Sequence, residues 1–321
     1  MLETSFTRLT GASVPIQIAA MPGISTHELV AATADAGALG MLSGVSLAPD
    51  RLAAELEQLG ARTRGVLGVN FLMPFLDAAC IPVAARAARV VELFYGEPDV
   101  KLVSAIHAGG ALASWQVGSL AEARAAERAG CDLVVVQGTE AGGHVRGDAS
   151  LLPLLSQVLD AVRIPVLAAG GIASARSLAA VLAAGASGAR MGTRFVATRE
   201  SGAHPAYVSA LLAASAADTC LTDAFSVLWP NAPHRVLRCA LAAAHALADG
   251  AIGETDLGGR RTPVPRLSVF SPTRDTTGRV DAMALYAGES VGDVTAIEPA
   301  AALVTELASS AERLLRGAGR A

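Results

Sequence analysis

The stretch "RAGCDLVVVQ" (Arg128–Gln137) holds the pattern that decides the fold of this chain. Its first residues end an alanine-rich amphipathic segment, and Leu133–Gln137 form a continuous apolar run that closes on an amide. Glycine after the last helical residue takes the left-handed conformation that terminates a helix. An unbroken apolar run is typical of a parallel strand covered on both faces. The stretch therefore predicts a helix end followed at once by a buried parallel strand.

The same pattern recurs in "ADAGALGML" (Ala34–Leu42), "HAGGALASWQ" (His107–Gln116) and "LAAGASGARMG" (Leu182–Gly192). Apolar runs predict eight strands, at Val14–Ala20, Ala38–Leu42, Gly65–Asn70, Val90–Tyr95, Ala111–Gln116, Leu133–Gln137, Pro165–Ala169 and Gly188–Gly192. Helices are predicted between them, at Thr26–Ala36, Pro49–Leu59, Ala78–Ala88, Val100–Ala108, Ser119–Ala129, Leu151–Ala161 and Ser174–Ala184. This alternation favours an α/β fold of the (β/α)8 TIM barrel type, with an open doubly wound sheet as the alternative.

The pattern changes after Thr198. Helices are expected at Pro205–Ala217 and His234–Ala248, in alternation with a stretch rich in proline, glycine, threonine and arginine, Gly258–Gly278. A last amphipathic helix near 299–317 is expected to pack back on the barrel wall. The chain is thus predicted to have a barrel at residues 1–200 and a smaller, mostly helical C-terminal cap at 201–298.

Composition argues against several classes of function. Of the 321 residues, 52 % are apolar and 17 % are charged, which predicts a large core rather than disorder. The net charge is −4 without a basic stripe, so a nucleic-acid partner is not expected. Apolar runs are too short to cross a membrane, and the first ten residues lack a signal-peptide pattern. The four cysteines have no C-x-x-C spacing, so we expect no metal site. A cytoplasmic monomer or homodimer is predicted.

Three predicted strands end on a carboxamide, at Asn70, Gln116 and Gln137, and the first strand is followed by Met21. Active sites of these barrels lie at the carboxyl ends of the strands. An amide donates and accepts hydrogen bonds at once, as recognition of a planar heterocycle requires. Each amide alone is better explained as a helix cap or a turn residue. Three at one rim indicate a shared ligand.

Glycines follow the seventh and eighth predicted strands, in "VLAAGGIAS" (Val166–Ser174) and "ARMGTRF" (Ala189–Phe195). Gly170–Gly171 and Gly192–Thr193 stand where backbone N–H groups can approach a phosphate. In barrels the loops after strands seven and eight are the usual phosphate site. Tight turns also use glycine, and Ser174 also suits the N-cap of the next helix.

The loop "QGTEAGGHVRG" (Gln137–Gly147) carries His144. A loop histidine is more often solvated than catalytic. This loop, however, is too rich in glycine to be held by its own packing, which suggests that a ligand orders it. A histidine pKa near neutrality suits proton transfer at working pH. His144 is therefore the candidate catalytic base.

Together these pieces resemble the nitronate monooxygenase family, FMN-dependent (β/α)8 barrels. The resemblance runs from Pro15 to about Ser201 and rests on "PIQIAAMPG", Asn70, "QGTEAGGH", "AAGGI" and "MGTRF", in that order. The segment "YAGESVG" (Tyr286–Gly292) is similar to a C-terminal "AGQ" segment of the family. FMN-dependent enoyl reductases and NADH:quinone reductases share the scaffold.

The resemblance implies a role for each matching residue. His144 matches the catalytic base. The positions that contact the flavin are matched by Met21, Asn70, Gln137 and Gly142, with Gly143 beside them. The positions at the FMN phosphate are matched by Gly171, with Gly170 beside it, and by Arg190, Met191, Gly192 and Thr193. Three residues depart from the motifs of the family. Arg190 replaces a common glutamine, Glu289 replaces the glutamine of "AGQ", and Val145 is inserted before Arg146.

The resemblance implies a monooxygenase that oxidises alkyl nitronates, or nitroalkanes after loss of a proton, with O2 to a carbonyl compound and nitrite. Two rival functions stay open. One is an NAD(P)H-dependent reductase of an enoyl thioester or a quinone on the same scaffold. The other is a non-enzymatic barrel that binds a phosphorylated ligand, which the glycine loops alone would support.

Overall fold

The computed structural model describes residues 2–318, and eight parallel strands form its central sheet. The sheet runs in the order β1-β9-β8-β6-β5-β4-β3-β2. Its strands are β1 (Ile16–Ile18), β2 (Gly40–Ser43), β3 (Leu67–Leu72), β4 (Val90–Phe94), β5 (Leu112–Val117), β6 (Leu133–Gln137), β8 (Val166–Ala169) and β9 (Gly188–Met191). Each lies within or overlaps one of the eight predicted strands.

Backbone hydrogen bonds connect the two edges of this sheet. Ile18 N–H donates to Leu39 O over 3.1 Å, and Leu39 N–H donates to Ile16 O over 2.9 Å. A parallel bridge between Gln17 and Leu39 accompanies them. The sheet is therefore nearly closed into a barrel, which decides against the open doubly wound alternative.

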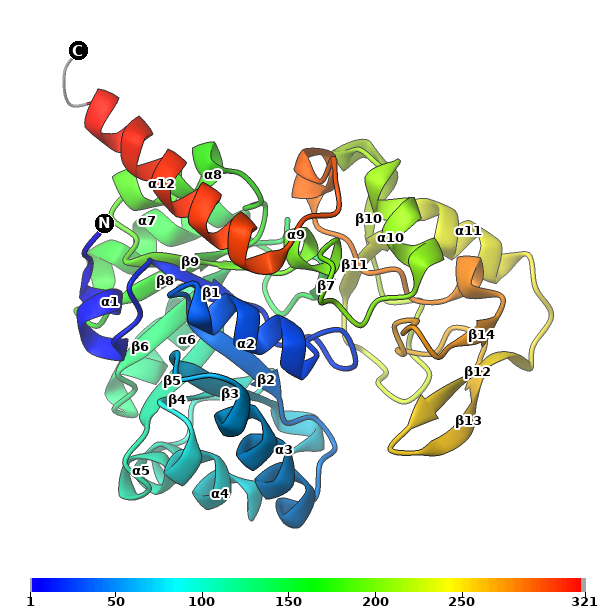
Figure 1. The fold of residues 1–321 in the computed structure, drawn as a ribbon, viewed down its shortest axis with the longest axis horizontal. Coiled ribbons are helices and arrows are strands. Elements are labelled where there is room, and N and C mark those ends of the chain that lie inside the picture. Colours follow the sequence, from blue (N-terminus) through cyan, green and yellow to red (C-terminus); the bar gives the residue numbers. More distant parts are fainter. Residues whose placement is uncertain (1, 319–321) are drawn as a thin grey trace.

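Helices alternate with the strands and cover the outside of the barrel (Figure 1). Four of the glycines that follow them, Gly37, Gly110, Gly130 and Gly185, have φ between 91° and 107°. This is the left-handed conformation that the recurring pattern predicts. The barrel helices are α1 (Ser5–Thr10), α2 (His27–Asp35), α3 (Pro49–Arg62), α4 (Cys80–Ala87), α5 (Val100–Ala108), α6 (Leu120–Arg128), α7 (Leu151–Ala161), α8 (Ala175–Ala183) and α9 (Thr193–Val196).

The last helix, α12 (Ala300–Ala318), lies across the barrel helices α8 and α2 (Figure 1). Its buried side chains, among them Leu303, Val304 and Leu307, belong to the same apolar core as the barrel strands. Among the described helices, none combines the length and the apolar character that a membrane crossing needs.

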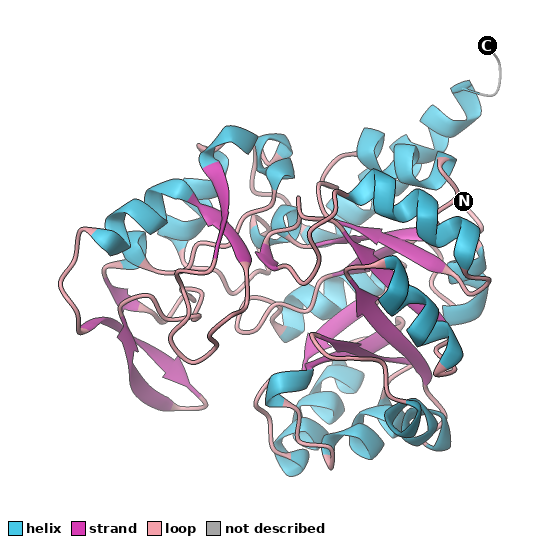
Figure 2. Cartoon of the chain, turned by 180° about the vertical axis from the view of Figure 1, so that it is seen from behind, coloured by secondary structure: helices cyan, strands magenta, loops and turns pink. Residues whose placement is uncertain are grey.

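Between α9 and α12 the chain forms a second lobe, seen from behind in Figure 2. It contains α10 (Pro205–Leu212), α11 (Arg238–His245) and two three-stranded sheets. The first sheet has the order β10-β11-β7 and the second β13-β12-β14. Their strands are β7 (Gly143–His144), β10 (Thr219–Thr222), β11 (His234–Leu237), β12 (Ala251–Leu257), β13 (Arg260–Pro265) and β14 (Thr277–Gly278).

The expectation of a mostly helical cap is therefore wrong, because the second lobe mixes strands with helices. The helix predicted at His234–Ala248 begins only at Arg238, since the four residues before it pair with β10 and with β7. The stretch Gly258–Gly278, rich in proline, glycine, threonine and arginine, contains β13 and β14. Gly258 and Gly259, with φ of 67° and 86°, form the tight turn between β12 and β13.

Candidate active site

His144 lies at the junction of the barrel and the second lobe. Its loop leaves β6, and Gly143–His144 then pairs as β7 with β11, where His144 stands opposite His234. The amide of Gln137, the last residue of β6, holds this loop: its Nε2 donates to His144 O over 2.9 Å, and Arg146 N donates to its Oε1 over 3.4 Å. The Gln137 side chain thus orders the histidine loop.

Val145, the next residue, joins the same loop to the second lobe. Its side chain is buried, and its N–H donates to Pro233 O over 2.8 Å. Arg146, which follows it, is ion-paired with Glu97 and Glu122. Val145 is therefore an anchor between the barrel loop and the segment that precedes β11.

Aromatic rings surround the His144 imidazole. The indole of Trp229 is stacked on it, with 4.0 Å between ring centroids and 22° between ring planes. Tyr95, Tyr286 and His234 lie at centroid distances of 6.2, 5.5 and 5.2 Å. The Nε2 atom of His144 is fully buried and has no hydrogen-bond partner. An unpaired nitrogen in such surroundings is costly and points to a missing proton donor or acceptor.

The same surroundings keep His144 neutral. Burial in this apolar cluster, with a smaller contribution from His234, lowers the pKa of His144 from its ordinary value near 6.5 to about 3. His234 is neutral for a similar reason, since burial lowers its pKa as well. At neutral pH the imidazole is therefore uncharged, and its lowered pKa makes it a weak base unless an anion lies beside it.

Inside the barrel, Glu92 and Arg190 form a buried ion pair with 2.7 Å between Oε1 and Nη1. Asn70 Nδ2 donates to Glu92 Oε1 over 2.9 Å, and Arg190 Nη1 donates to Gln116 Oε1. Gln17 Nε2 also donates to the Glu92 carboxylate, over 3.0 Å. The ion pair thus fixes the orientation of two of the three amides singled out in the sequence.

This network directs the side chain of Arg190 toward Glu92 and Gln116, inside the barrel. It also leaves Asn70 Oδ1 and Gln116 Nε2 without a hydrogen bond among the described residues, and neither atom is fully buried. Asn70 therefore offers a hydrogen-bond acceptor and Gln116 a hydrogen-bond donor at the barrel mouth.

The glycines predicted to form a phosphate site lie at the same end of the barrel. Gly170 and Gly171 have φ of 108° and 68°, which side-chain-bearing residues rarely adopt. Ser174 caps α8 by accepting from Ser177 N, which is its simpler predicted role. Gly192 lies close to Met21, since a Cβ on Gly192 would stand 3.8 Å from the Met21 sulfur. Met191 is buried in the core.

Gly142 and Thr193 meet the segment at residues 286–290. A Cβ on Gly142 would stand 2.5 Å from Gly288 N, and Gly288 N donates to Thr193 Oγ1 over 3.0 Å. Beside this contact, Glu289 pairs with Arg235 over 3.1 Å, and Arg235 Nε also donates to Thr139 O. The acidic residue at 289 is thus matched by a nearby arginine.

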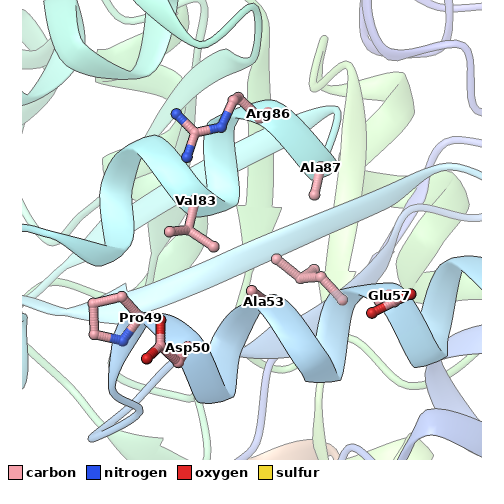
Figure 3. A pocket seen from close by; sticks show the side chains of 8 residues that line it. Pro49, Asp50, Ala53, Glu57, Val83, Arg86 and Ala87 are labelled. Atoms are coloured by element: carbon pink, nitrogen blue, oxygen red, sulfur yellow. The ribbon is translucent and has the colours of Figure 1, made fainter.

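A surface groove lies between α3 and α4, as Figure 3 shows, and is lined by Pro49, Asp50, Glu57, Val83 and Arg86. None of these lining residues is among the side chains described around His144. Within residues 2–318, no group of three histidine, cysteine or acidic side chains is arranged to hold a metal ion.

Comparison with known proteins decides the family. A sequence model described as "Nitronate monooxygenase" matches residues 3–82 and 77–310. The chain belongs to the nitronate monooxygenase family. The resemblance of its motifs to that family is therefore confirmed.

Relatives of this nitronate monooxygenase family member carry different names. A Mycobacterium tuberculosis protein named (3aS,4S,5R,7aS)-5-hydroxy-7a-methyl-1-oxo-octahydro-1H-indene-4-carboxyl-CoA dehydrogenase is 37 % identical over 244 residues, which cover 75 % of this chain and 67 % of the relative. FabK from Thermotoga maritima has a TM-score of 0.81 at 28 % identity and covers 99 % of both chains. A nitroalkane oxidase from Streptomyces ansochromogenes has a TM-score of 0.77 at 30 % identity, covering 98 % of this chain and 99 % of its own.

Sequence reasoning missed several residues of this family member's site. Glu92 lies in the middle of β4 and Tyr95 directly follows this strand, so neither is an amide at a strand end of the kind that marked Asn70, Gln116 and Gln137. Trp229 and Tyr286 come from the second lobe, more than 80 residues away in sequence from His144. One signal was available: the chain has only two tryptophans, and Trp229 is one of them.

Proposed function

We propose that this chain is an FMN-dependent oxidoreductase that oxidises nitronates, with His144 as its proton acceptor. The observation that carries the proposal is the neutral, buried and unpaired Nε2 atom of His144 at the carboxyl end of the barrel. The family to which the chain belongs and its likeness to a nitroalkane oxidase support the reaction class.

The residues present fit a flavin mononucleotide. Asn70 Oδ1 and Gln116 Nε2 offer an acceptor and a donor suited to a planar heterocycle. Gly170 and Gly171 place backbone without side chains where a phosphate would approach. Bound there, the flavin would supply the redox chemistry of the reaction.

The chain itself would handle binding and the proton. A neutral nitroalkane would lose its α-proton to His144 Nε2, and the resulting nitronate anion would stabilise the imidazolium, because an opposite charge nearby favours the charged form. A preformed nitronate would not need this step. Gln137 and Val145 would keep His144 in place during the reaction. O2 is the proposed oxidant, and a carbonyl compound and nitrite are the proposed products.

A second candidate is a reductase or dehydrogenase that acts on a thioester with a nicotinamide. It is favoured by the likeness to a CoA-ester dehydrogenase and to FabK. Anaerobic addition of NADPH to the flavin-loaded protein separates the two candidates. Rapid bleaching of the flavin would support the reductase, whereas bleaching by a nitronate alone would support the proposed oxidation.

His144→Ala tests the role of the histidine. We expect it to retain FMN and to lower kcat/KM for a neutral nitroalkane by about 10²-fold or more, as removal of a general base does, with a much smaller loss for the preformed nitronate. His107→Ala is the matched control, because His107 pairs with Asp132 on the outer surface of the barrel. Nitrite release and the flavin spectrum are the measurements. Equal, small losses on both substrates would remove His144 from the mechanism.

A further inference from the structure

The rings around His144 form an aromatic cage, which we define as Phe75, Tyr95, Trp229 and Tyr286. Trp229 is its centre: its indole stacks on His144 and meets Phe75 and Tyr95 edge-on, at centroid distances of 5.1 and 4.6 Å. Only 7 % of Trp229 is exposed. The cage therefore covers the face of the imidazole.

The cage is assembled from both lobes. Phe75 and Tyr95 follow the barrel strands β3 and β4, and Tyr95 is held at φ 66°, a conformation that a residue other than glycine rarely adopts. Trp229 comes from the loop 225–233. His234 ties both ends of that loop, since Phe225 N donates to His234 Nε2 over 3.2 Å and the other ring nitrogen lies 2.8 Å from Ala232 O. The indole is therefore positioned by hydrogen bonds as well as by packing.

Access to His144 constrains the substrate. Because Nε2 is fully buried, a molecule that exchanges a proton with it must take the place of part of the cage. The displaced stacking contact is regained only if the incoming group is itself flat and unsaturated. A saturated chain of the same size would fill the space without restoring that contact.

The charges near the cage also bear on which substrate fits. The nearest arginines along the chain are already engaged, Arg146 with Glu97 and Glu122 and Arg235 with Glu289. Tyr286 and Tyr95 stay neutral, because burial raises the pKa of both phenols. The cage thus favours an uncharged or charge-delocalised group over a localised carboxylate.

We propose that Trp229 determines the substrate specificity of this site, and that the site takes molecules whose reacting carbon is conjugated to a flat, unsaturated group, such as aryl nitronates. The reaction assigned to these substrates rests on the proposed function, whereas the binding preference does not. It places specificity on a ring of the second lobe that contacts the catalytic histidine directly.

The binding test uses the full-length, FMN-loaded protein and two unreactive neutral probes of similar size, benzamide and cyclohexanecarboxamide. Equilibrium dialysis gives the ratio of their dissociation constants. We expect the wild type to prefer benzamide by about tenfold, the upper range of an aromatic contact. Trp229→Phe should keep most of this preference, and Trp229→Leu should reduce it to less than about twofold.

Kinetics provide the second readout. The ratio of kcat/KM for phenylnitromethane nitronate over propyl-2-nitronate should exceed one in the wild type and fall in Trp229→Leu. If that variant does not fold, as judged by circular dichroism, Trp229→Met takes its place. A benzamide preference that is absent in the wild type, or unchanged in the leucine variant, overturns the proposal. If neither nitronate releases nitrite while the preference persists, the proposed function fails and the role of Trp229 stands.

Discussion

At the scale of single residues, the buried pair of Glu92 and Arg190 explains the most unusual feature of the barrel interior. An arginine inside a barrel is costly unless a matched anion accompanies it. Here the positive charge of Arg190 in β9 is balanced by the carboxylate of Glu92 in β4, and the pair also holds Asn70 and Gln116. Neither residue can be understood alone.

This coupling predicts a non-additive response to substitution. Arg190→Gln leaves the Glu92 carboxylate buried without its cation, and we expect a loss of about 3–5 kcal/mol in the free energy of unfolding. The double variant Glu92→Gln with Arg190→Gln removes both charges while keeping amides in place, and should lose much less. Urea unfolding at pH 7.5 measures both. Losses that simply add would show that the pair is not coupled.

At the scale of elements, the contact between the histidine loop and residues 286–290 depends on two glycines that face each other. Gly142→Ala would place a methyl group 2.5 Å from Gly288 N, so one segment must move. We expect the variant to unfold at a lower temperature and to bind FMN more weakly. Gly60→Ala in α3 is the control: its Cβ meets nothing within 4 Å, and it should stabilise the helix by about 0.5–1 kcal/mol. Thermal unfolding and FMN titration compare the two, and an unaffected Gly142→Ala protein would contradict the close contact.

The elements also show what local sequence can and cannot predict. The eight barrel strands were predictable from their apolar runs, and before β2, β5, β6 and β9 the helix also ends on a glycine whose backbone requirement is local. β11 was not, since His234–Leu237 becomes a strand only by pairing with β10 and with β7 from a distant loop. The β12–β13 hairpin did leave a local signal in Gly258–Gly259, which the surrounding arginines and prolines obscured.

The candidate site likewise has parts that the local sequence predicts and parts that it does not. Gln137 ends β6 and His144 lies in the loop that follows, which the chain order reveals, whereas Asn70 and Gln116 lie inside β3 and β5. The orientation of Asn70 and Gln116 follows from Glu92 and Arg190, and the covering of His144 follows from Trp229, which are contacts between segments far apart in sequence. Such contacts depend on the packing of the whole chain and have no local pattern.

At the scale of the whole molecule, the two neutral histidines predict a pH dependence of stability. His144 has a folded pKa of about 3, and the pKa of His234 is also lowered, whereas both would titrate near 6.5 in the unfolded chain. Below pH 6.5 the unfolded state therefore binds more protons, and stability falls as the pH falls. Each histidine that stays neutral contributes a slope of about 1.4 kcal/mol per pH unit.

Urea unfolding at pH 7.5, 6 and 5 measures this slope above the range in which carboxylates titrate. His144→Phe keeps an aromatic ring stacked against Trp229 and removes one titrating group. Its free energy of unfolding should vary less with pH than that of the wild type. An equal slope in both proteins would mean that His144 is protonated in the folded state.

The pairing of β7 with β11 has a consequence for how this protein changes over evolutionary time. The proposed proton acceptor is hydrogen-bonded into the sheet of the second lobe, although its loop originates in the barrel. Mutations that reshape the second lobe for a new substrate therefore shift the histidine along with the walls around it. The proposed selectivity and the proposed proton transfer would then change together, while the barrel that would carry the cofactor could stay the same.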